Sequence, residues 1–246
     1  MILALETSGR SGSAAIYFPS EDVVTAFTPL TEGSAKTLAP VVSDLLSKSK
    51  VKPSELTAIA VTVGPGSFTG LRVGVAMAKA LAYGLRIPVV GVDTLEVLAT
   101  DFLRYLQHSG KGTGNFGDSF EFWTALDAYR SEFFMAKWSV SAEASISCLL
   151  ASHLIGGQAW RDLVASVPSR TIVIGSGCQK LSLGKALEVD PVVWFSNVTP
   201  TAISVGQLGH EKLQRGQSSS PMELMPIYLR GSAAEEKKSA MARVTS

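Results

Sequence analysis

The chain has little charge, little histidine and little cysteine, and each shortage excludes a class of function. Charged residues make up 17% of its 246 positions and the formal net charge is +1, which excludes a strongly basic nucleic-acid groove. The two cysteines, Cys148 and Cys178, are too few for a disulfide framework or a zinc set. The three histidines, His108, His153 and His210, never have the spacing that places two ligands on one helix face. We therefore expect no metal site.

The sequence also lacks an apolar run long enough to cross a membrane. It begins directly on a strand pattern, residues 2–5, without the charged leader and cleavage site of a signal peptide. We therefore expect a cytoplasmic protein with no membrane contact. Its apolar fraction is 46%, which leaves room for apolar surface that a partner covers.

The most informative segment runs from residue 58 to residue 83. A buried strand over 58–63 is broken by Gly-Pro-Gly at 64–66, and Ser67 or Thr69 can cap the helix that follows. Small residues recur at every fourth position of this segment, namely Gly66, Gly70, Gly74, Ala78 and Ala82. Because each glycine inside a helix costs about 0.5–1 kcal/mol relative to alanine, the ridge predicts close approach of another backbone. That backbone belongs either to the protein's own sheet or to a partner's helix.

Three catalytic patterns are absent or incomplete. Leu71 follows Gly70 where a Walker loop needs lysine, so this is not a P-loop, although an anion site of another kind stays open. No Gly-x-Ser-x-Gly elbow marks a serine nucleophile. Glu6, Thr7 and Ser8 end the first strand, and Asp127 has the same place after a later strand. Acids there can handle metal and phosphate, so these four residues are candidate nucleotide contacts. The alternative is a turn that satisfies its own backbone.

The predicted elements are those of an α/β protein with mixed sheets. Strands are expected at 2–5, 13–18, 23–28, 58–63, 89–92, 121–126, 132–138 and 171–174, and helices at 35–49, 67–83, 94–106 and 201–215. Strand, acidic turn and strand around Asp127 repeat the pattern of the N-terminus and hint at duplication. The predicted organisation is an N-terminal lobe (1–108), a Gly-rich linker or loop (109–119), a second lobe (120–200), a C-terminal helix and strand (201–230) and a disordered tail (231–246).

Several motifs occur in an order that resembles the bacterial TsaB (YeaZ) family. They lie at residues 2–8, 64–74, 88–95, 127–128, 174–177 and 226–230. The resemblance implies an actin-like, Hsp70-like (ASKHA) two-lobed fold without catalysis of its own. Catalytic members of that superfamily carry His-x-x-x-His in the first long helix, whereas residues 32–36 contain no histidine and Ser34 stands at the usual position of one.

The family resemblance also implies a function. It implies a non-catalytic scaffold or activator that pairs with the paralogue TsaD in forming N6-threonylcarbamoyladenosine at position 37 of tRNA. The ATPase TsaE joins them, ATP and magnesium are used by the complex, the chain has no cofactor of its own, and tRNA is reached only through the complex. A homodimer of the isolated protein stays open. Pairing through homologous helices implies partner contacts at Leu38, Val42, Gly66, Phe68, Thr69, Gly70, Arg72, Val73, Gly74 and Met77.

Two other functions compete with this one. An ATP-dependent small-molecule kinase of the same fold would need Asp127 as a working residue and a glycine that closes on phosphate, but Ala128 and Tyr129 follow instead. A peptidase would need a nucleophile or a metal set that the sequence does not provide.

Overall fold

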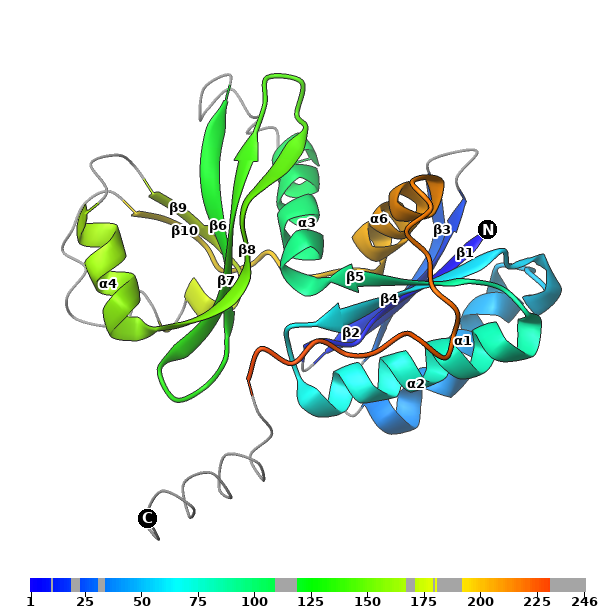
Figure 1. Ribbon diagram of the computed structural model, residues 1–246. Helices are drawn as coiled ribbons and strands as arrows, with labels where there is room; N and C mark the ends of the chain where they lie inside the picture. Colours follow the sequence, from blue (N-terminus) through cyan, green and yellow to red (C-terminus); the bar gives the residue numbers. More distant parts are fainter. Residues whose placement is uncertain are drawn as a thin grey trace, which may run out of the picture.

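The computed structural model describes residues 1–9, 11–18, 23–30, 34–108, 119–166, 171–178, 180 and 192–230. In this part the chain forms two lobes, each built on a five-stranded sheet (Figure 1). Lobe I has the strand order β3-β2-β1-β4-β5. Its strands are β1 (Ile2–Glu6), β2 (Gly12–Phe18), β3 (Val23–Leu30), β4 (Ala58–Gly64) and β5 (Val89–Asp93).

Lobe II repeats this topology with the order β10-β9-β6-β7-β8. Its strands are β6 (Phe120–Asp127), β7 (Glu132–Val140), β8 (Ile146–Gly156), β9 (Thr171–Ile174) and β10 (Val192–Phe195). In each lobe three antiparallel strands form a meander, and the first of them also pairs in parallel with the fourth strand. The expected mixed α/β fold is confirmed, and the duplication suggested by the two acidic turns extends to whole sheets.

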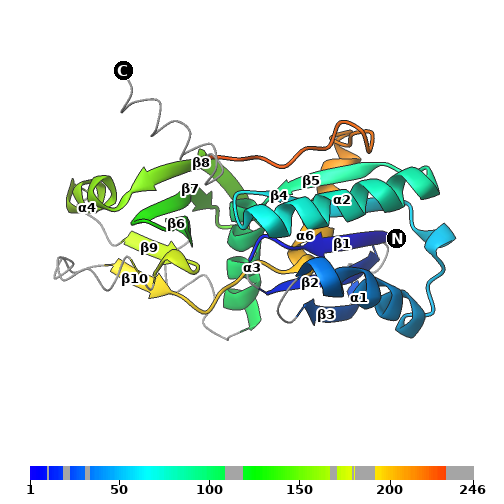
Figure 2. The same ribbon diagram turned by 90° about the horizontal axis from the view of Figure 1, so that it is seen from below.

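Lobe I is layered, with helices on both faces of its sheet (Figures 1 and 2). Helices α1 (Ser34–Lys48) and α2 (Phe68–Leu85) cover one face, and α6 (Ala202–Gln214) covers the other. Because β1 and β4 are buried on both faces, they consist of continuous apolar runs rather than alternating ones. This is why the sequence identified both central strands.

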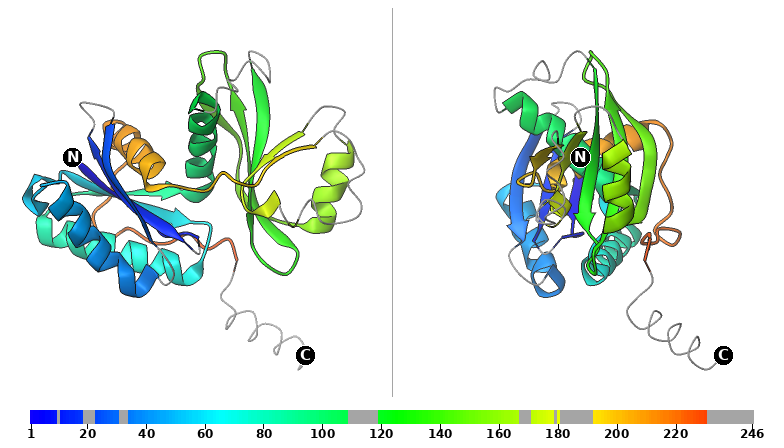
Figure 3. Two further views of the ribbon diagram at one scale, coloured as in Figure 1. Left: turned by 180° about the vertical axis from the view of Figure 1, so that it is seen from behind. Right: turned by 90° about the vertical axis from the view of Figure 1, so that its left-hand side faces the viewer.

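Helix α3 (Thr94–His108) lies between the lobes (Figure 3). Its Leu98 and Phe102 pack into the core of lobe II, whereas Val97 belongs to the core beneath α6 in lobe I. The predicted domain ranges follow the order of the strands along the chain. The packing differs from them, because α3 lies largely against lobe II and α6, which is later in the sequence, lies on lobe I.

The remaining elements are short. They are a 3-10 turn (Pro53–Glu55) and α4 (Gly157–Ser166), which packs through Trp160 on the second sheet. None of the described helices is long and apolar enough to cross a membrane. The predicted linker, apart from Ser119, and the predicted tail 231–246 lie outside the described residues.

The C-terminal segment, residues 217–230, is here called the strap. The sequence predicted a strand in this region, and that prediction is wrong, because the strap makes a single isolated bridge between Ser219 and Val89. Pro221 and Pro226 lack the N–H groups that a continued ladder would need. The strap instead runs from lobe I to lobe II as an extended segment (Figure 2).

Candidate functional site

The glycine ridge of α2 faces the protein's own first strand and not a partner. A Cβ atom on Gly70 would overlap the carbonyl oxygen of Thr7, and one on Gly74 would overlap the Thr7 hydroxyl. At Gly66 a Cβ would lie 2.6 Å from the carbonyl oxygen of Ser8. The glycines therefore let α2 approach the end of β1, which decides between the two backbones that the sequence left open.

This geometry corrects part of the predicted partner surface. Gly70 and Gly74 are buried under Thr7, Gly66 lies against Ser8, and Leu38 and Val42 of α1 belong to the core of lobe I. A partner cannot touch the buried ones without unpacking the monomer. Five of the predicted contacts keep exposed or partly exposed side chains, and these are Phe68, Thr69, Arg72, Val73 and Met77.

Helix α2 presents an exposed face on its other side, here called the α2 face. It consists of Thr69, Arg72, Ala76, Ala80 and Tyr83, which recur every three or four residues and are all exposed. Val73 and Met77 are partly exposed beside this row. The face contains one charged residue, and its Arg72 and Tyr83 are residue types that are enriched where one protein packs against another.

The cations of α2 are both bound by the strap. Arg72 donates from Nε to the Tyr228 hydroxyl at 3.0 Å, and its guanidinium lies 3.8 Å from the centre of the Phe68 ring. Lys79 donates to the carbonyl oxygens of Met222 and Leu224 at 3.3 and 3.1 Å. Neutral oxygen acceptors within the chain therefore replace part of the water around both cations. The strap adds exposed apolar side chains next to the α2 face, namely Met222, Met225, Ile227 and Tyr228.

The local sequence explains how α2 is placed. Ser67 caps the helix by accepting a hydrogen bond from the Gly70 amide at 3.3 Å, which settles the choice between Ser67 and Thr69. The helix ends at Arg86, whose φ of 57° is left-handed. Leu71, Val75, Ala78 and Ala82 form its buried side.

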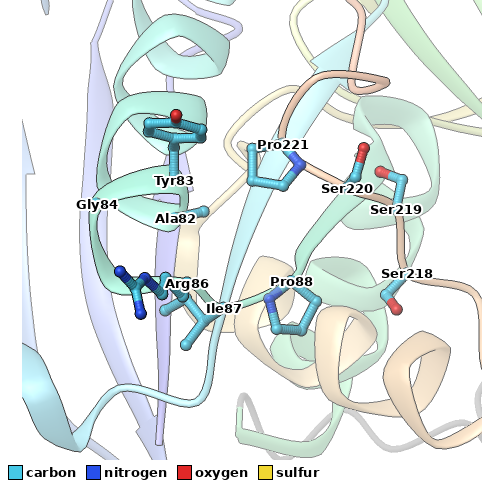
Figure 4. A pocket seen from close by; sticks show the side chains of 10 residues that line it. All are labelled: Ala82, Tyr83, Gly84, Arg86, Ile87, Pro88, Ser218, Ser219, Ser220 and Pro221. Carbon is cyan, nitrogen blue, oxygen red and sulfur yellow. The ribbon is translucent and has the colours of Figure 1, made fainter.

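A groove of about 750 Å³ lies between the end of α2 and the start of the strap (Figure 4). Tyr83, Arg86 and Pro88 form one side of it, and residues 218–221 form the other. The side chains that line it, all within the described part of the chain, supply one cation and no carboxylate. None of the predicted nucleotide contacts lines this groove.

Three of those candidate nucleotide contacts, Glu6, Ser8 and Asp127, are bound within their own lobes, whereas the buried hydroxyl of Thr7 has no hydrogen-bond partner among the described residues. In lobe I the Glu6 carboxylate accepts hydrogen bonds from the amide, at 2.7 Å, and from the hydroxyl of Ser8. In lobe II, Asp127 accepts a hydrogen bond from the Tyr129 amide at 2.9 Å and forms an ion pair with Lys180 at 2.7 Å. Among the described residues, no three His, Cys, Asp or Glu side chains are grouped so that they could hold a metal ion.

Burial raises the pKa of Glu6 to about 7, although its two hydrogen bonds with Ser8 act in the opposite direction. The carboxyl is 1% exposed, so water cannot stabilise the charged form. Near neutral pH the Glu6 carboxyl is therefore neutral in some molecules and ionised in others. It is hydrogen-bonded to its own turn rather than directed at a ligand.

This pKa predicts a pH-dependent effect of Glu6→Gln. A carboxyl with a higher pKa in the folded state binds more protons there, so the free energy of unfolding falls as pH rises from 4.5 towards about 7. Glutamine keeps the acceptor for Ser8 but does not titrate. We expect it to stabilise the protein by about 2–3 kcal/mol at pH 8 and by little at pH 5. Urea denaturation at both pH values measures the difference, and an equal effect at both would contradict this origin.

Asp101 on α3 is a buried acid that sequence reasoning missed. Its carboxylate accepts hydrogen bonds from the Thr201 amide and hydroxyl, at 2.8 and 2.7 Å, and from the Ser204 hydroxyl at 2.7 Å. Burial raises its pKa to about 6. The residue ties α3 to the first turn of α6 where the lobes meet. Its position directly before Phe102, inside an apolar helix face, was the signal that could have identified it.

Comparison with known proteins finds relatives of this chain and solved structures with the same fold. Residues 31–109, from α1 to α3, match the profile of the family described as TsaD: tRNA N6-adenosine threonylcarbamoyltransferase. A curated relative from Bacillus subtilis, tRNA threonylcarbamoyladenosine biosynthesis protein TsaB, is 37% identical over 100 residues, which are 41% of this chain and 44% of that protein. The protein of the same name from Escherichia coli is 25% identical over 96% of this chain and 97% of its own length.

A solved structure from Pseudomonas aeruginosa, described as similar to peptidase YeaZ, superposes with a TM-score of 0.74 at 24% identity. It covers 93% of this chain and 99% of its own. This likeness concerns the fold, and it includes both lobes. The ordered motifs, the two duplicated sheets and the relatives agree, and the chain is similar to the TsaB (YeaZ) proteins over both lobes.

Proposed function

We propose that this protein is an accessory subunit in tRNA threonylcarbamoylation. It pairs with a TsaD-type threonylcarbamoyltransferase in forming N6-threonylcarbamoyladenosine at position 37 of tRNA. The names of the relatives from Bacillus subtilis and Escherichia coli, both tRNA threonylcarbamoyladenosine biosynthesis proteins, support this role.

The observation that carries the proposal is the position of the α2 face. The face lies on the segment that matches the TsaD family, residues 31–109, so a TsaD-type partner has a helix pair of the same ancestry. Two related surfaces can pack about an approximate twofold axis, as in an isologous dimer. The exposed row formed by Ala76 and Ala80 lets a facing helix approach closely.

The subunit itself acts without catalysis in this proposal. The acids that a kinase would use are engaged, because Glu6 is bound by Ser8 and Asp127 is paired with Lys180. The turn after Asp127 has no glycine that could close on a phosphate, so a small-molecule kinase is not favoured. ATP and magnesium then act elsewhere in a cytoplasmic complex that includes the ATPase TsaE, and tRNA is bound through that complex.

We expect no ATP hydrolysis by the purified protein alone. The physical reason is that neither acidic turn offers both a free carboxylate and a backbone able to surround a phosphate. Phosphate release from the purified chain measures it, with Asp127→Ala as the comparison. Hydrolysis that Asp127→Ala abolishes would contradict the accessory role and favour the kinase.

The proposed function is tested by reconstitution. The TsaD and TsaE proteins of the same organism are incubated with tRNA, threonine, bicarbonate, ATP and the enzyme that makes the threonylcarbamoyl donor, with and without this chain. The proposal predicts modified adenosine only when this chain is present. Equal modification in its absence would overturn it.

A further inference from the structure

The strap is held to lobe I along most of its length. Ser219 and Val89 exchange two backbone hydrogen bonds, of 3.0 and 3.2 Å, at the free edge of β5. Leu224 is buried in the core of lobe I, and the Ile227 amide donates to the Val63 carbonyl at 2.7 Å. Tyr228 then contacts α2 through Arg72, and its ring lies 4.8 Å from that of Phe68. These contacts set the path of the strap on lobe I.

The last two residues of the strap contact lobe II. Leu229 packs against the lobe II core. Arg230 donates from Nη1 to the Ala128 carbonyl and lies 3.5 Å from the Tyr129 carbonyl. It also forms an ion pair with Glu132 at 3.3 Å. One guanidinium therefore binds both ends of the turn between β6 and β7.

That turn has an unusual backbone. Tyr129, Arg130 and Ser131 have φ values of 62°, 52° and 60°, so three consecutive residues other than glycine are left-handed. Such residues are unfavourable one by one, and a run of them persists only where surrounding contacts hold it. The carbonyl of Ser131 accepts from the Gly157 amide at 2.8 Å, and Arg230 binds Ala128 and Glu132 on the two sides of the run.

We propose that residues 228–230 form a clasp that fixes the angle between the lobes and links the α2 face with the β6–β7 turn. The clasp is short, since only Leu229 separates the residue bound to α2 from the residue bound to lobe II. A displacement of Tyr228 by a molecule on the α2 face is thereby transmitted to the turn that follows Asp127. The inference concerns the free protein and holds whether or not the proposed pairing with a TsaD-type partner is correct.

The test is a distance measurement between spin labels on the two lobes of the full chain. The exposed Cys148 on β8 takes one label, and Ser47→Cys on the exposed side of α1 takes the other, while Cys178 is buried. The parent protein should give one narrow distance distribution. Arg230→Ala should broaden it by about twofold or more, because the lobes lose a link at their junction.

Matched variants separate the clasp from general effects. Arg215→Ala removes an exposed arginine whose side chain forms an ion pair with Glu211 of α6 at 3.9 Å, and it should leave the distribution unchanged. Arg230→Lys keeps the positive charge near Glu132 but loses the planar guanidinium, whose several N–H donors have a fixed geometry. It should broaden the distance distribution to an intermediate width. Should Arg230→Ala fail to fold, the lysine variant decides. A distribution as narrow as the parent's in every folded Arg230 variant would overturn the proposal.

Discussion

Ala80→Glu is expected to weaken binding to a TsaD-type partner by about 100-fold or more while the monomer stays folded. Ala80 is exposed on the α2 face, between Ala76 and Tyr83. In the free protein the new carboxylate is solvated, but a helix packed on this face would bury it without a counter-ion. The cost of about 3 kcal/mol or more corresponds to that loss of affinity. Titration calorimetry with the purified partner measures it.

The control for this variant is Ala159→Glu, which places the same charge on an exposed alanine of α4 in lobe II. It should bind like the parent protein. Circular dichroism melts of both variants check that each is folded. Unchanged affinity of Ala80→Glu, with a melting temperature equal to the parent's, would mean that the partner binds elsewhere.

Gly74→Leu is expected to destabilise the isolated protein. The side chain would have to enter the space occupied by Thr7, which is fully buried at the end of β1. Overpacking of this kind costs about 1–3 kcal/mol, which outweighs the gain in helix propensity of up to about 1 kcal/mol. For a chain of this size each kcal/mol lowers the melting temperature by about 2–4 °C.

The matched control for Gly74→Leu is Ala76→Leu, two residues further along the same helix on its exposed face. It adds nearly the same side chain where nothing packs within the monomer, so the melting temperature should hardly change. The difference between the melting temperatures of the two variants therefore shows which way the glycine ridge faces. A Gly74→Leu protein that melts at or above the parent's temperature would mean that the ridge does not face β1.

The sequence predicted the ridge but not what it faces. The four-residue spacing of Gly66, Gly70 and Gly74 follows from the chain alone, and so does the need for a close neighbour. Which backbone lies there depends on the pairing of β1 with β4, since that pairing brings Thr7 under α2. Spacing is a local property, whereas the identity of the neighbour is set by the sheet.

Spacing along the chain also could not tell partner contacts from core residues. Leu38 and Val42 are apolar at helical spacing, which suits a partner surface and a core equally well, and the structure places both in the core. The exposed alanines, Ala76 and Ala80, have no chemistry that draws notice in a sequence. They stand out only once the buried side of α2 is known.

Three elements of lobe II were not predicted, namely β8, α4 and β10. In β8 the residues from Ser147 to Ala151 are all exposed, because the strand lies at the edge of its sheet, so no alternation of apolar and polar residues marks it. β10 has four residues, as β9 does, but all four are only partly buried. The central strands β6 and β9 were predicted because they carry buried apolar residues that periodicity can detect.

The most direct test of the central claim is a hydrogen-exchange footprint of this chain bound to the TsaD protein of the same organism. The proposal predicts that peptides covering α2, residues 68–85, exchange more slowly in the complex than in the free chain. Peptides covering α4, residues 157–166, should exchange equally in both states. Protection confined to lobe II, or no complex at all between the two purified proteins, would contradict the account.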